Sequence, residues 1–181
     1  TDMAMYRKDP KKNTIAALVS NRSGVLTRIS GLFARRGYNI ESLSVCATED
    51  PELSRMTIVL NGDEYTLYQM IKQMDKLDDV KKIGCADELD CVYRELLLVK
   101  VPASADVRSQ IVEIKEIYKA KVVDLSPDTM ILELTGIPTK LDAFLKVIEP
   151  YGIIEMQRTG VTVLARGRHT LKDRDCYGDN I

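Results

Sequence analysis

The first candidate for chemistry in this sequence is the segment Asn21-Arg22-Ser23-Gly24-Val25-Leu26. It places an amide, a hydroxyl and a glycine directly before apolar residues at helical spacing. The start of a helix presents unpaired backbone N–H groups and the positive end of the helix dipole, so it can hold a carboxylate without a cationic side chain. Ser23 is the expected N-cap, and Gly24 lets a ligand approach the backbone closely. The alternative is an ordinary capped turn that binds nothing.

A second polar residue, Asn39, follows the expected end of the same helix at Arg36-Gly37-Tyr38. It has two interpretations, a C-terminal capping residue or a polar contact for a ligand. Taken alone, the position favours the cap.

Side chains suited to acid–base catalysis or metal binding are scarce. The one histidine, His169, lies in a polar C-terminal stretch, where we expect a solvated side chain. The four cysteines form no Cys-x-x-Cys pair and have no histidine at metal-ligand spacing, so we expect buried, reduced thiols. They are Cys46, Cys85, Cys91 and Cys176. The sequence therefore predicts no catalytic residue and no metal site in this chain.

Length and composition narrow the class of protein. The chain has 181 residues, which allows one generous domain or two small ones, and 45% hydrophobic with 29% charged residues suits a folded protein. With 26 Lys+Arg against 27 Asp+Glu, the net charge of -1 argues against a nucleic-acid partner. No apolar run is long enough to span a membrane, and no signal peptide is apparent. We expect a cytoplasmic protein, with a trimmed plastid or mitochondrial form as the alternative.

Hydrophobic periodicity predicts four strands and two helices in the first half. Val25, Ile29 and Phe33 mark one face of a helix that Gly37 ends, and the turn at Glu49-Asp50-Pro51-Glu52 joins two strands into a hairpin. The second helix is marked by the apolar spacing from Leu67 to Leu77. The predicted strands are residues 14–19, 40–47, 53–60 and 80–85.

The second half repeats this order without repeating the sequence. The continuous run Leu96-Leu97-Leu98-Val99 predicts a strand within 95–101 that is buried on both faces. Apolar spacing marks one helix from Val107 to Tyr118 and another from Leu141 to Ile148. The other predicted strands are residues 122–125, 130–135, 153–157 and 161–165. The sequence therefore predicts an α+β fold of two consecutive ferredoxin-like βαββαβ domains.

The expected domain limits follow from these patterns. The boundary lies where the composition turns acidic, near Asp87 to Asp90, which gives domains at 13–89 and 90–167. Residues 1–12 and 168–181 are charged, aperiodic tails that we expect to be unstructured or variable.

The residues then carry a resemblance to a family. The stretch Ala34-Arg35-Arg36-Gly37-Tyr38-Asn39-Ile40-Glu41-Ser42-Leu43 resembles the ACT domain of the small, regulatory subunit of acetohydroxyacid synthase, also called acetolactate synthase. Further similar segments are Leu53-Ser54-Arg55-Met56-Thr57-Ile58, Arg94-Glu95-Leu96-Leu97-Leu98-Val99-Lys100, Lys121-Val122-Val123-Asp124 and Lys140-Leu141-Asp142-Ala143-Phe144-Leu145. They run in family order from about Thr14 to Gly167.

The resemblance implies that the first domain is an ACT domain and that the chain is a non-catalytic regulatory subunit. It would activate a separate catalytic large subunit, which carries thiamine diphosphate, FAD and Mg²⁺, and confer feedback inhibition by valine, leucine or isoleucine. The effector would bind between two ACT domains of a homodimer. The implied contacts are Asn21, Gly24, Val25 and Leu26 of one chain and Asn39 and Ile40 of its mate. Arg22 departs from the acidic residue common at its position, so it would shift effector affinity or preference.

Two other classes of function remain as alternatives. A stand-alone amino-acid-sensing enzyme would need a nucleophile–base pair, and none is legible in the sequence. An RNA-binding module shares the βαββαβ order but would need aromatic residues on its central strands, and Leu53 to Leu60 has none. Within the favoured reading, Asp75, Asp78 and Asp79 form either a solvated helix end, the preferred interpretation, or a contact with the catalytic subunit.

Overall fold

The computed structural model describes residues 12–86 and 90–173. The described chain divides into two compact units. The first contains the described residues of Thr1–Val92 and of Val163–Ile181, and the second is Tyr93–Thr162.

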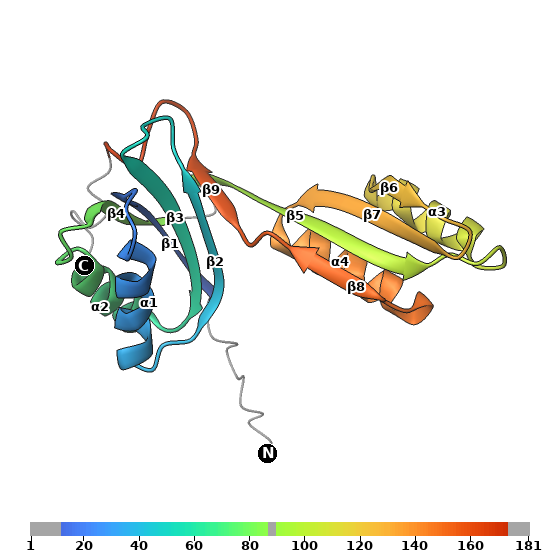
Figure 1. The fold of residues 1–181 in the computed structure, drawn as a ribbon, viewed down its shortest axis with the longest axis horizontal. Helices are drawn as coiled ribbons and strands as arrows, with labels where there is room; N and C mark the ends of the chain where they lie inside the picture. The colour runs from blue at the N-terminus through green and yellow to red at the C-terminus, as the bar shows by residue number, and fades with distance from the viewer. Residues whose placement is uncertain (1–11, 87–89, 174–181) are drawn as a thin grey trace, which may run out of the picture. The chain divides into compact units, whose positions relative to one another are not determined.

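The first unit has the predicted βαββαβ order. Its strands form a four-stranded antiparallel sheet in the order β2-β3-β1-β4, and Figure 1 shows α1 and α2 together on one side of that sheet. The elements are β1 (Lys12–Ser20), α1 (Val25–Arg35), β2 (Ile40–Ala47), β3 (Leu53–Asn61), α2 (Glu64–Met74) and β4 (Val80–Ala86). The predicted hairpin is confirmed, because β2 pairs with β3.

The first helix owes its position to one apolar face. Val25, Ile29 and Phe33 are buried at intervals of four residues, which keeps them on the side that meets the sheet. Gly37 ends the helix as predicted: it adopts a φ of 69°, and its N–H donates to Ala34 O. The N–H of Tyr38 then donates to Phe33 O, the paired hydrogen-bond pattern of a glycine-terminated helix.

The core of the first unit lies between the two helices and the sheet. Its largest buried side chains are Ile15, Ile29, Phe33, Met56, Ile58, Leu60, Met70 and Met74.

The second unit repeats the fold. Four strands of its sheet are paired in the order β6-β7-β5-β8, and a fifth strand, β9, pairs with β5. Its core contains Leu97, Val99, Val101, Ile111, Met130, Leu132, Leu141 and Phe144. The elements are β5 (Cys91–Pro102), α3 (Arg108–Tyr118), β6 (Lys121–Leu125), β7 (Thr129–Gly136), α4 (Pro138–Ile148), a 3-10 turn at Glu149–Tyr151 and β8 (Glu155–Arg158). The last strand, β9, is Thr162–Ala165, and all of it but Thr162 belongs to the first unit. The ferredoxin-like order predicted for both halves is confirmed.

One prediction about β5 is wrong. We expected the strand to be buried on both faces, but burial alternates along it: Leu97 and Val99 are buried, whereas Leu96 and Leu98 are only partly covered. The buried residues pack in the cluster that contains residues of α3 and α4, and the alternate residues point to the other side of the pleat. The long apolar run therefore does not indicate a strand covered from both sides.

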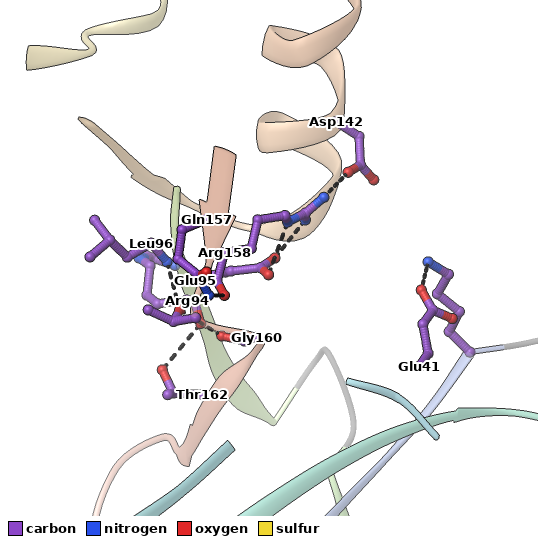
Figure 2. Close-up of polar contacts among 11 residues, drawn as sticks. Glu41, Arg94, Glu95, Leu96, Asp142, Gln157, Arg158, Gly160 and Thr162 are labelled. Carbon is purple, nitrogen blue, oxygen red and sulfur yellow. Dashed lines mark hydrogen bonds and ion pairs between the residues drawn. The ribbon is translucent and has the colours of Figure 1, made fainter. Parts of the chain in front are cut away.

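An ion cluster around the buried Glu95 joins β8 and α4 to β5 (Figure 2). The guanidinium of Arg158 donates to both carboxylate oxygens of Glu95, at 3.0 and 2.6 Å, and to Asp142 at 2.6 Å. Glu95 is only 6% exposed. These hydrogen bonds, chiefly those with Glu95, raise the pKa of Arg158. Because the pair is bidentate and largely shielded, it fixes the register of β8 against the strand beside it.

The described residues 163–173 at the C-terminal end belong to the first unit and contact it. Arg55 donates from Nη2 to Val163 O at 2.9 Å, and the Arg166 N–H donates to Asp90 O at 2.8 Å. Leu171 is buried, and Lys172 pairs with Glu49. The described residues from Val163 to Asp173 thus group with the first unit, whereas we expected residues up to 167 to belong to the second. Residues 1–11 and 174–181, with Cys176, lie outside the described residues.

Candidate functional site

The turn between β1 and α1 leads into the start of α1, and there is open space beside Gly24 in this turn. The first hydrogen bond along the helix runs from Arg28 N to Gly24 O at 3.0 Å, so the N–H groups of Val25, Leu26 and Thr27 precede it. Gly24 has a φ of 85°, and a Cβ atom placed there would meet no other heavy atom within 4 Å. A small ligand can therefore approach these amides, which carry the positive end of the helix dipole.

The expected cap of this helix is wrong. Gly24, rather than Ser23, occupies the N-cap position, and no side chain caps the helix. Because the left-handed backbone at Gly24 lies between Ser23 and the first helical residue, Ser23 precedes the position from which a hydroxyl reaches the helix amides. The N–H groups at the start of α1 therefore receive no hydrogen bond acceptor from a capping side chain.

Asn21 is held by the connection between β2 and β3. Its backbone N–H donates to Glu52 O at 2.8 Å and its side-chain amide to Pro51 O at 2.9 Å, while its side-chain oxygen accepts from Ser54 at 3.1 Å. An asparagine amide has two donors and an oxygen with two acceptor positions, so one of each remains for a ligand. Asn21 therefore orients the turn and still has capacity for a further contact.

Val25 and Leu26, the next two predicted contacts, point in different directions. The side chain of Val25 packs in the core, so its backbone N–H is what it can offer. Leu26 is 47% exposed and can contribute an apolar surface beside the helix start.

Asn39 and Ile40 lie near the other end of α1. In Figure 1 the chain passes from the end of α1 into the start of β2, where Ile40 is half-buried and Asn39 is exposed. Arg36 and Gly37 terminate the helix, so the capping interpretation of Asn39 is wrong. An 11-residue helix is about 16 Å long. A single chain therefore does not bring Asn39 and Ile40 to Gly24 and Leu26.

The strand that begins at Ile40 is an edge of its sheet. Among the described strands β2 pairs with β3 alone, and Val45 along it is exposed. An exposed edge of this kind can pair with a further strand.

Asp79 is the part of this region that the sequence interpretation missed. We expected it at a solvated helix end with Asp75 and Asp78, and those two are exposed. Asp79 is only 3% exposed and forms ion pairs with Arg22 and Arg28 at 2.7 and 2.6 Å. The hydrogen bond from Arg22 is the main cause that lowers its pKa. The two arginines are 57 and 51 residues away in sequence, so no local pattern could reveal the cluster.

The remaining chemical candidates are placed as follows. His169 is exposed, as expected. Cys91 is buried, but Cys46 is exposed, so the expectation of buried thiols is wrong for Cys46, which lies on the edge strand β2. Within residues 12–86 and 90–173, no group of three or more histidine, cysteine or acidic side chains is arranged to hold a metal ion, and no helix is both long and apolar enough to cross a membrane.

Two family models match the chain. The AHAS small subunit-like ACT domain matches residues 15–82, and the small subunit of acetolactate synthase matches residues 94–167. Together they span the two expected domains but for a short segment between them.

Two relatives and a solved structure agree with these models. The acetolactate synthase small subunit of Mycolicibacterium smegmatis is 48% identical over 155 residues, which are 86% of this chain and 91% of the relative. The probable acetolactate synthase small subunit of Methanothermobacter thermautotrophicus is 44% identical over 92% of this chain and 100% of its own. The crystal structure of the acetolactate synthase small subunit from Thermotoga maritima has a TM-score of 0.81 at 35% identity, and the match covers 88% and 99% of the two chains.

Proposed function

Because the chain belongs to the family of small, regulatory subunits of acetolactate synthase, we propose that it activates the catalytic large subunit and makes it subject to feedback inhibition by a branched-chain amino acid. Valine is the expected effector, with leucine and isoleucine as the alternatives. The chain itself performs no bond chemistry in this proposal. Thiamine diphosphate, FAD and Mg²⁺ are assigned to the catalytic subunit.

The observation that carries the effector site is the open helix start at Gly24. An amino acid has a carboxylate for the N–H groups that precede the first helical hydrogen bond, and these groups lie beside a glycine with free space above it. The half-exposed side chain of Leu26 supplies an apolar contact for a branched side chain. The remaining acceptor position of Asn21 suits the ammonium group.

The second half of the site is proposed to come from another copy of the chain. Asn39 and Ile40 are separated from Gly24 by the length of α1, so they contribute to a shared site only when two chains meet. The edge of β2 that pairs with no other described strand begins at Ile40 and is a surface through which two copies can associate. We therefore propose a homodimer in which the turn of one chain faces the start of β2 of its mate.

A shared site explains how binding can regulate activity. An effector changes an equilibrium only by the difference in its affinity for the two states, typically about 1 to 3 kcal/mol. When the ligand contacts two chains, its affinity depends on how the chains are arranged. In this proposal valine binds the low-activity arrangement of the complex more tightly than the active one.

The test is a titration of the purified chain with valine, leucine and isoleucine, first alone by calorimetry and then mixed with its catalytic subunit while acetolactate formation is followed. We expect the chain to raise the activity of the catalytic subunit and to make it sensitive to at least one of the three amino acids. D-valine, which has the same groups in the mirror-image arrangement, is the control ligand. Stimulation without binding or inhibition by any of the three would contradict the effector part of the proposal, and absence of stimulation would contradict the rest.

A further inference from the structure

Asp79 joins three points of the chain around the candidate site. Its Oδ1 accepts a hydrogen bond from Arg22, which precedes Gly24, and its Oδ2 accepts one from Arg28, in the first turn of α1. Its backbone oxygen also accepts from the N–H of Ser20 at 2.8 Å. One residue of the turn between α2 and β4 therefore holds the end of β1, the turn and the start of the helix.

The opposite side of the turn is held by the β2–β3 connection through Asn21. The turn thus has anchors on both sides, and the exposed Ser23 and Gly24 lie between the residues that are anchored. A binding site keeps its geometry when neighbouring groups fix the elements that carry it. Asp79 is such a neighbouring group for the turn that carries the N–H groups at the start of α1.

The ion pairs of Asp79 with Arg22 and Arg28 also determine which charges lie near a ligand at the helix start. The side chains of Arg22 and Arg28 are both 66% exposed, whereas the carboxylate that engages them is buried. Without this carboxylate two long cationic side chains beside the helix start would be released. They would attract any anion and repel the ammonium group of an amino acid.

We propose that Asp79 is a positioning residue of the effector site, which fixes the β1–α1 turn and, by engaging Arg22 and Arg28, makes the site select a zwitterionic amino acid over an anion of the same shape. This inference rests on the proposed function. It adds a determinant of selectivity that lies outside the contacts implied by the family resemblance.

The test uses the full chain with Asp79→Asn, a substitution of nearly equal shape. Two probes are titrated: valine, and the 2-oxo acid that has the side chain and carboxylate of valine but no ammonium group. We expect valine to bind about tenfold more weakly, a change of about 1.4 kcal/mol. The affinity of the oxo acid should fall less or rise, so that the ratio of the two affinities shifts toward the anion. Asp78→Asn, at the exposed neighbouring position, is the matched control and should leave both affinities unchanged.

A second variant removes positive charge from the site, whereas Asp79→Asn removes negative charge, so the expected change in selectivity is reversed. In Arg22→Gln/Arg28→Gln the carboxylate of Asp79 loses both arginine partners and the site loses two positive charges, so the oxo acid should lose more affinity than valine. This variant also keeps the proposal testable if Asp79→Asn does not fold. Asp79→Glu retains the charge and should retain the parental ratio.

The proposal would be overturned by an Asp79→Asn chain that melts at a lower temperature yet keeps the parental affinity for valine and the parental ratio, because Asp79 would then serve the fold alone. Equal shifts of both probes in the two variants would likewise overturn the selectivity. A parent chain that binds none of the branched-chain amino acids would instead refute the proposed effector function, and this inference with it.

Discussion

The hydroxyl of Ser54 donates a 3.1 Å hydrogen bond to the side-chain oxygen of Asn21, 33 residues away in sequence. Ser54 is buried on β3, and the bond ties that strand to the turn before α1. Ser54→Ala removes one anchor of the turn. We expect a loss of about 1 kcal/mol in the free energy of unfolding, measured in urea. Valine binding, measured by calorimetry, should weaken severalfold because Asn21 is less well held.

Ser30→Ala is the control for this prediction. The hydroxyl of Ser30 bonds within α1, to Thr27 O, and alanine favours a helix, so neither stability nor binding should fall. Unchanged valine affinity in Ser54→Ala would show that the orientation of Asn21 is irrelevant to the site.

Gly24→Asp tests the helix start itself. The substitution places a carboxylate where the carboxylate of the effector is proposed to lie, so valine inhibition should be abolished while activation of the catalytic subunit is retained. The positive φ at Gly24 also strains any side chain placed there, and the experiment must separate this strain from the charge.

Gly24→Asn provides that separation, since asparagine has nearly the same shape, no charge and a better tolerance of the left-handed conformation. We expect Gly24→Asn to keep part of the valine response, as read from inhibition curves of the reconstituted enzyme. Valine sensitivity equal to that of the parent in Gly24→Asp would show that the assignment of the site is wrong.

The elements of the fold could be predicted from local patterns. The apolar spacing from Val25 to Phe33 and the glycine at 37 predict α1 because one helical face and one left-handed residue are sufficient signals. The alternating burial of β5 could not be predicted in the same way. The apolar run in β5 is compatible with a strand covered on one face or on both faces. The structure shows that the helices α3 and α4 cover only one of them.

The helix start of the candidate site could be predicted from the sequence, but the contacts that hold it in place could not. Gly24 and the residues after it stand together in sequence, so a helix start is visible there. Ser23 was misplaced as the cap because the sequence does not show that Gly24 itself turns left-handed. Asp79 looked like part of an acidic helix end, and its partners Arg22 and Arg28 come from a distant segment.

The ion cluster in the second unit should behave as a coupled pair. Arg158→Gln leaves the carboxylate of Glu95 buried without its cation, and we expect a loss of about 3 kcal/mol in the free energy of unfolding. Glu95→Gln should cost less, because Arg158 is partly exposed and keeps its ion pair with Asp142. The double variant should lose less than the sum of the two single losses, which urea denaturation of all four chains measures.

Asp142→Asn is the comparison for that cycle. The side chain of Asp142 is 46% exposed, so losing its bond to Arg158 should cost less than about 1 kcal/mol. Strict additivity of the Arg158 and Glu95 substitutions would contradict an energetic coupling between them.

Acid should remove the contribution of Asp79 at a defined pH. Its pKa is lowered in the fold from an ordinary 3.8, chiefly by the hydrogen bond from Arg22, so the unfolded chain binds the proton more readily. The stabilisation is therefore complete above the ordinary pKa and is lost as pH falls through the lowered value.

The measurement is the difference in free energy of unfolding between the parent and Asp79→Asn. It should stay constant from about pH 8 to about pH 5 and shrink at more acidic pH, because the other carboxylates are common to both chains. A difference that already disappears near neutral pH would contradict a charged, hydrogen-bonded carboxylate at this position.

Complementation between two defective chains tests whether the valine site is shared between two copies. Gly24→Asp damages the turn and Asn39→Ala damages the start of β2, so each variant alone should bind no valine. In a dimer that contains one of each, a shared site leaves one of the two pockets intact and concentrates both defects in the other. Co-expression with two different affinity tags isolates this mixed dimer.

Calorimetry of the mixed dimer with valine gives the decisive result. If the site is shared, we expect binding with about half the parental number of sites and nearly parental affinity, because one pocket is composed of undamaged elements from both chains. A mixed dimer that forms but binds no valine would place both elements in a pocket of a single chain. Failure of the chains to pair at all would contradict the shared site itself.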